Sequence, residues 1–112
     1  MPNSASAAGN GAPWAMGDFL YSLEAREDLL EIWEFIALDD LDSADRVERE
    51  IEQAVTKLAA NPQLGHIRSD LTSKRVRFWA VYSYLIIYRP ETHPLEVVRI
   101  LSGYRDITKM LK

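Results

Sequence analysis

Two segments of the chain repeat their apolar residues at the spacing of an amphipathic α-helix. The first follows Ser22, the expected N-cap, and the second ends before Asn61-Pro62, because a proline disfavours helix at the residue before it. Acidic residues at 39–42 separate them, and Asp42 or Ser43 is the expected cap of the second helix. So short a connection predicts an antiparallel helical hairpin. The apolar positions are Ala25, Leu29, Ile32, Trp33 and Ile36, then Ala44, Val47, Ile51, Ala54, Val55 and Leu58.

Two aromatic residues of the first helix have different expected positions. Trp33 belongs to the apolar stripe, so it is expected in the core. Phe35 lies about 100° away from that stripe on a helical wheel. It is therefore expected at the margin of the core or in contact with a partner.

The remaining apolar segments have the composition of β-strands. A short strand is expected at 18–21, and another from about Lys74 with a bend at 80–82. Two β-branched and aromatic runs, 84–89 and 95–101, flank a connector with two prolines and predict a hairpin. The predicted fold is an α+β domain of order β-α-α-β-β-β, in which the helical hairpin packs on a small antiparallel sheet.

In the run from Tyr84 to Tyr88, both alternating sets of positions carry apolar residues, which indicates a strand buried on both faces. The helical hairpin can cover only one face. We expect the C-terminal tail or a bound partner to cover the other.

Length and composition limit the possible classes of protein. A chain of 112 residues is one domain, here expected at 18–112, and the uncharged segment 1–17 is expected to be a disordered leader rather than a secretory signal or a membrane span. The absence of cysteine excludes disulfides and thiolate metal sites, and it fits a reducing cytoplasm. The two histidines, His66 and His93, have no cluster of acids at metal-ligand spacing, so we expect no metal and no cofactor.

The net charge of −4 is unevenly distributed. Residues 18–62 carry thirteen acidic and four basic side chains, a net charge of −9. Residues 63–112 carry four acidic and nine basic side chains, a net charge of +5. The asymmetry favours a charged partner for the basic half, or two surfaces with different partners, although a solvated surface explains the acidic helices equally well.

The candidate binding residues come from this basic half. Arg75 and Arg77 share strand parity with Trp79, so these side chains are expected on one face, where they contact a partner or protect an exposed sheet edge. Arg99, inside the last strand, is expected to meet a partner or an acid of the helical hairpin. Gly103 lets the chain turn and present Arg105, which is either a functional residue or a C-terminal anchor.

Four segments, in this order and at these separations, resemble the RelE/ParE superfamily of bacterial toxins. The resemblance runs from about Phe19 to Asp106. The helix with Trp33-Glu34-Phe35-Ile36, the turn at 61–65 and the strand at 84–88 are more similar to the ParE branch than to RelE. The matching segments are 29–37 (LLEIWEFIA), 58–65 (LAANPQLG), 84–89 (YLIIYR) and 98–106 (VRILSGYRD).

The resemblance to ParE implies a toxin of a type II toxin–antitoxin (plasmid stabilisation) system that inhibits DNA gyrase. It implies neutralisation by a ParD-like antitoxin in a hetero-oligomer, a cytoplasmic location, no membrane, and contact with DNA only through gyrase or the antitoxin.

RelE-like members of the superfamily instead cleave messenger RNA on the ribosome without a metal. The resemblance places their central-strand arginine at Leu85, their post-glycine arginine at Arg105 and their C-terminal tyrosine near Leu111. Because leucine cannot transfer a proton, no catalytic residue is assigned. Two alternatives stay open: a ribonuclease with another constellation, and a silent homologue that only binds antitoxin and regulates its operon. That constellation is Arg75, Arg77, Tyr82 and Lys109.

Overall fold

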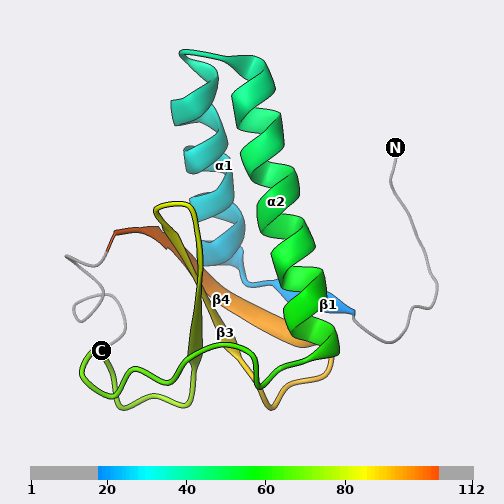
Figure 1. The fold of residues 1–112 in the computed structure, drawn as a ribbon, viewed down its shortest axis with the longest axis vertical. Helices are drawn as coiled ribbons and strands as arrows, with labels where there is room; N and C mark the ends of the chain where they lie inside the picture. The colour runs from blue at the N-terminus through cyan, green and yellow to red at the C-terminus, as the bar shows by residue number, and fades with distance from the viewer. Residues whose placement is uncertain (1–17, 104–112) are drawn as a thin grey trace.

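A computed structural model of the chain describes residues 18–103, and its elements follow the predicted order (Figure 1). The α+β prediction is therefore confirmed. The expected leader at 1–17, the C-terminal tail and Arg105 lie outside the described residues. The elements are β1 (Phe19–Tyr21), α1 (Leu23–Ala37), α2 (Leu41–Ala60), β2 (Arg77–Val81), β3 (Tyr84–Arg89) and β4 (Leu95–Ser102).

A side chain caps the N-terminus of each helix. Ser22 caps α1 as predicted, and its Oγ accepts a hydrogen bond of 3.0 Å from the Ala25 backbone N–H. The cap of α2 is Asp40, not Asp42 or Ser43; the Asp40 carboxylate accepts from the N–H of Asp42 and from the hydroxyl of Ser43. The prediction was wrong because several neighbouring residues have cap-forming side chains, and only backbone geometry decides which one precedes the first turn.

The sheet has the strand order β1-β4-β3-β2. The predicted hairpin of β3 and β4 is confirmed, and β2 pairs antiparallel with β3. The short β1 pairs with β4 in parallel, opposite Leu95–Val97 only, so the sheet is mixed. The second half of β4 therefore has no strand beside its outer edge.

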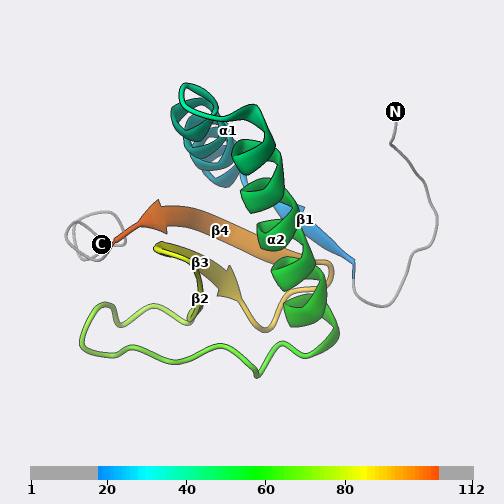
Figure 2. The same cartoon turned by 45° about the horizontal axis from the view of Figure 1, so that its top comes forward.

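The helices cover one face of the sheet, where the main core forms (Figure 2). Both helical stripes supply it from above, and alternate residues of β3 and β4 supply it from below. The fully buried members are Ala25, Ile51, Val55, Leu58, Ile86, Tyr88 and Val97.

Among the described residues, the connection between α2 and β2, residues 61–76, covers the other face of the sheet (Figure 2). Leu71 and Val76 from this connection pack on Leu85 and Ile87 of β3. The sequence analysis did not assign this cover to the connection, because the segment has neither strand nor helix periodicity, yet it contributes apolar side chains.

The two aromatic residues of α1 both lie outside the central core, although Trp33 was expected within it. Trp33 is only partly buried and donates its indole N–H to Asp45 Oδ1 at 2.9 Å, so it lies outside the central cluster. Phe35 is 72% exposed, which places it away from the core. Within residues 18–103, neither helix is long and apolar enough to cross a membrane.

Candidate functional site

The structure separates the predicted binding residues into two groups. Arg75 and Arg99 line one hollow, whereas Arg77 and Trp79 lie against the connection after α2. Arg75 lies before the start of β2 at Arg77 and lines the hollow, so the structure does not bring it together with Arg77 and Trp79.

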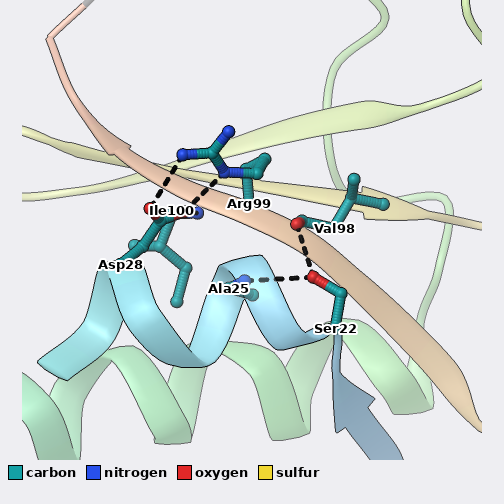
Figure 3. Close-up of polar contacts among 6 residues, drawn as sticks. All are labelled: Ser22, Ala25, Asp28, Val98, Arg99 and Ile100. Carbon is teal, nitrogen blue, oxygen red and sulfur yellow. Dashed lines mark hydrogen bonds and ion pairs between the residues drawn. The ribbon is translucent and has the colours of Figure 1, made fainter. Parts of the chain in front are cut away.

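Arg99 is held by a bidentate ion pair with Asp28 of α1 (Figure 3). Its Nε donates to Asp28 Oδ2 at 2.7 Å and its Nη2 donates to Asp28 Oδ1 at 2.9 Å. The Asp28 carboxylate raises the pKa of the Arg99 guanidinium, which is therefore charged at physiological pH. The expected salt bridge between Arg99 and an acid of the helical hairpin is confirmed.

Asp28 and Ser22 also form hydrogen bonds with backbone groups at the unpaired edge of β4. Asp28 Oδ2 also accepts the backbone N–H of Ile100 at 3.0 Å, and Ser22 Oγ donates to the carbonyl of Val98 at 2.7 Å (Figure 3). Both groups lie where β1 has ended and no strand is available to bind them. α1 therefore replaces the missing strand with side-chain hydrogen bonds, which fixes Arg99 relative to the sheet.

A β-bulge brings two consecutive residues of β4 to one side. Arg99 is opposite Ile87 and Val97 is opposite Tyr88, so Val98 is the extra residue in the ladder. Both Val98 and Arg99 line the hollow, although strict alternation would place them on opposite faces. Sequence periodicity could not predict this arrangement.

The hollow has a volume of about 530 Å³ and opens beside the bulge. We call it the cationic hollow. Four basic and two acidic side chains surround a small apolar floor, and this gives the lining a net charge of +2. Its lining residues are Glu24, Lys74, Arg75, Val76, Arg89, Glu91, Thr92, Val98 and Arg99.

Most of the cations in the cationic hollow are weakly compensated. Arg75 is 3.7 Å from Glu91, with an 85% exposed side chain, and Arg89 is 3.5 Å from Glu96. Exposed pairs at such distances contribute about 0–1 kcal/mol, so an incoming anion can replace them. Among the described residues Lys74 forms no ion pair, and Arg99 Nη1 makes no hydrogen bond. The hollow is therefore suited to bind carboxylates or phosphates.

Arg77 has a structural role in the described part of the chain. Its guanidinium donates to the carbonyl of Gly65 at 2.8 Å and to the side-chain carbonyl of Gln63 at 2.6 Å. The Tyr88 hydroxyl fixes the same turn from below, because it accepts from the Gly65 N–H and donates to the Pro62 carbonyl. A side chain on Gly65 would overlap the Tyr88 ring, which explains why glycine stands there.

Trp79 contacts both a cation and an imidazole. Lys57 Nζ lies 5.4 Å from the centre of the indole ring, and His66 stacks on it with a centroid distance of 6.2 Å. The backbone of His66 also pairs with Phe78, which holds the connection against the outer edge of β2. These contacts favour a packing role for Trp79.

The groups needed for phosphodiester cleavage are not assembled among the described residues. Leu85 is 4% exposed and packs in the second core cluster, so this position offers no proton donor. Arg75 precedes β2 and Tyr82 follows it, so the whole strand lies between these two residues. The Tyr82 hydroxyl instead donates to Glu50 of α2 at 2.6 Å. Lys109 and Leu111 lie outside the described residues.

Sequence reasoning missed part of this site. It did not assign Lys74, Arg89 or Glu24, although Arg89 ends an apolar strand and is visible as a cation at an element boundary. The signal for Asp28 was weaker, since it is one of several acids on α1. No group of three metal-binding side chains occurs among residues 18–103.

Comparisons with known proteins identify a family and a similar solved structure. The sequence profile of the family described as "ParE toxin of type II toxin-antitoxin system, parDE" matches residues 19–107. Among solved structures, a chain of the chromosomal ParDE TA system from P. aeruginosa superposes with a TM-score of 0.65 at 19% identity. The match covers 79% of this chain and 97% of that one, and at this identity it shows the fold. A comparison with curated proteins returns no match.

Proposed function

The chain belongs to the family of ParE toxins of type II toxin–antitoxin systems, and we propose that it inhibits DNA gyrase until a ParD-like antitoxin neutralises it. Family membership carries this proposal, since the profile matches nearly the whole described domain. Inhibition by binding needs a contact surface rather than acid–base groups. The cationic hollow offers such a surface.

The cationic hollow is our proposed contact for an acidic, extended segment of the antitoxin. Four cations converge on it from three parts of the chain, and only Arg99 is held in a strong ion pair. An acidic segment that displaces the weak pairs of Arg75 and Arg89 would be held by several cations at once. Arg105 remains a proposed target contact.

The gyrase proposal can be tested with purified protein in supercoiling and cleavage reactions. Loss of supercoiling together with accumulated cleaved DNA is the expected result. Translating ribosomes with a primer-extension readout provide the comparison, since codon-phased cuts in the messenger would refute the gyrase proposal in favour of a RelE-type nuclease. No effect in either assay would identify a silent homologue that only binds antitoxin.

The cationic hollow can be tested separately by charge reversal. Lys74→Glu and Arg75→Glu change exposed side chains and are expected to weaken antitoxin binding by about tenfold or more in combination. Arg49→Glu, an equivalent change on the exposed surface of α2, is the matched control and should leave the affinity unchanged. Equal antitoxin affinities of the combined Lys74→Glu and Arg75→Glu variant and of the Arg49→Glu control would refute the proposal that the cationic hollow is part of the interface.

A further inference from the structure

The cations of the cationic hollow come from three separate segments of the chain. Lys74 and Arg75 precede β2. Arg89 is the last residue of β3, and Arg99 lies inside β4. A carboxylate has two oxygens in one plane, whereas a phosphate group carried on a single ester bond offers three acceptor oxygens in a tetrahedral arrangement. Three such oxygens match donors from three segments, because each segment can donate to an oxygen of its own.

The protein's own carboxylates leave the donors of the cationic hollow largely available. Arg75 Nη1 is 3.7 Å from Glu91, and Arg89 Nε is 3.5 Å from Glu96. Charge-assisted hydrogen bonds between a guanidinium and a carboxylate are about 2.7–2.9 Å long, so neither pair is closely formed. The guanidinium groups of Arg75 and Arg89 are therefore available to an external anion.

Arg99 supplies a fixed donor to the same hollow. Asp28 binds its Nε at 2.7 Å and its Nη2 at 2.9 Å, whereas Nη1 makes no hydrogen bond with the described residues. The hydrogen bond with Asp28 raises the pKa of Arg99, so the guanidinium keeps its charge. Because this side chain is already ordered, an anion that binds Nη1 pays little of the usual entropy cost.

The rest of the lining indicates what the phosphate group is attached to. The hollow has a volume of about 530 Å³, within the range of small-molecule sites, so it has room for an organic part beside the phosphate. Val76 and Val98 provide an apolar floor, and Glu24 and Glu91 provide acceptors for hydroxyl groups. The described lining residues include no aromatic side chain on which a base would stack. This combination suits a sugar better than a nucleobase.

We propose that the cationic hollow binds a small sugar phosphate, whose phosphate group is held by Arg75, Arg89 and Arg99. Glu24 accepts hydrogen bonds from the hydroxyl groups of the sugar. The inference goes beyond the proposed function, because it needs neither gyrase nor an antitoxin. A nucleic-acid strand is a poorer ligand, since residues 18–62 carry a net charge of −9 and repel its further phosphates. An acidic antitoxin segment in the same hollow competes with the sugar phosphate for its cations.

The test titrates the full-length protein with ribose 5-phosphate, inorganic phosphate and ribose, followed by isothermal titration calorimetry in a low-salt buffer without phosphate. Ribose 5-phosphate is expected to bind at least about fivefold more tightly than inorganic phosphate, since it adds hydrogen bonds to a charged acceptor. Ribose alone should show no binding. Equal affinities for ribose 5-phosphate and inorganic phosphate overturn the assignment of the sugar, and no binding of ribose 5-phosphate at about 10 mM overturns the whole inference.

Variants of the protein then locate the ligand. The combined Lys74→Glu and Arg75→Glu variant should weaken ribose 5-phosphate by at least about tenfold, and the Arg49→Glu control on α2 should leave its affinity unchanged. Glu24→Ala is expected to act in opposite directions. It should tighten inorganic phosphate, because a like charge is removed, and weaken ribose 5-phosphate, because an acceptor is removed. Far-UV circular dichroism checks that each variant is folded.

The remaining outcomes separate this inference from its alternatives and from the proposed function. Ribose 5-phosphate binding that is insensitive to the double charge reversal overturns the assignment to the cationic hollow. A 5′-phosphorylated tetrathymidylate is expected to bind no more tightly than ribose 5-phosphate, and tighter binding of this strand identifies a nucleic acid instead and overturns the inference. A negative gyrase assay, or an antitoxin affinity unchanged by the double charge reversal, refutes the proposed function but leaves the sugar phosphate result unaffected.

Discussion

Asp28→Ala is expected to lower the free energy of unfolding by about 3 kcal/mol. The Asp28 carboxylate accepts two hydrogen bonds from Arg99 and one from the backbone N–H of Ile100. The side chains of Arg99 and Asp28 are 21% and 12% exposed, so water screens the pair only partly. Breaking a buried pair costs about 3–5 kcal/mol, and the higher helix propensity of alanine offsets about 0.5 kcal/mol of that loss.

Urea unfolding, followed by far-UV circular dichroism, measures this loss. With a slope of about 1–3 kcal/mol per M, the midpoint should fall by about 1 M or more at an unchanged slope. Glu27→Ala removes an exposed acid from the adjacent position of α1 and is the control, with an expected effect within about 0.5 kcal/mol.

A double-mutant cycle with Arg99→Met isolates the ion pair itself. Because Asp28 and Arg99 share two hydrogen bonds, a coupling energy of about 2 kcal/mol is expected. A loss below about 1 kcal/mol for Asp28→Ala would refute the reasoning that this carboxylate replaces a strand at the edge of β4. A coupling energy near zero would show that Asp28 acts through Ile100 alone.

Three further substitutions test other parts of the structure. Tyr88→Phe should cost about 1–3 kcal/mol in urea unfolding, because the buried Gly65 N–H loses its acceptor, and an unchanged midpoint would contradict this. Tyr21→Phe removes a buried hydroxyl that has no partner, so we expect unchanged or higher stability, and a loss above about 1 kcal/mol would reveal a missing partner. Asp40→Ala should lower the melting temperature at pH 7. The Ser43 hydroxyl lowers the folded pKa of Asp40 below its ordinary value of 3.8. The stabilisation by Asp40 is therefore present above about pH 4 and is lost as the pH falls through the folded pKa. The melting temperatures of the wild type and of Asp40→Ala should thus converge near about pH 2.

The sequence predicted the elements well because their signals are local. Helical spacing, the Ser22 cap and the proline after Asn61 define α1 and α2 without reference to the rest of the chain. The β3–β4 hairpin is likewise a contact between neighbours. The pairing of β1 with β4 joins residues more than seventy positions apart, and no local pattern specifies it.

The site was less predictable, since its geometry depends on interruptions of regular structure. Strand parity placed Arg75 beside Trp79, whereas β2 begins only at Arg77. The bulge at Val98 then turned two consecutive residues toward the same hollow. The sequence did identify the basic residues of the C-terminal half as candidate binding residues. The difference in charge between the two halves does not depend on which face of a strand each residue occupies.

Arg99 is one of the residues for which the sequence left two interpretations, here a partner contact or a structural ion pair. The geometry makes the readings compatible, since Asp28 binds Nε and Nη2 and the residue still lines the cationic hollow. A loss of toxicity in Arg99→Ala would therefore be ambiguous between weaker binding and weaker folding. The exposed Lys74 and Arg75 line the same hollow and have no comparable buried contact. Charge reversal at these two positions thus tests binding alone, and Arg99 should be interpreted only against its measured stability.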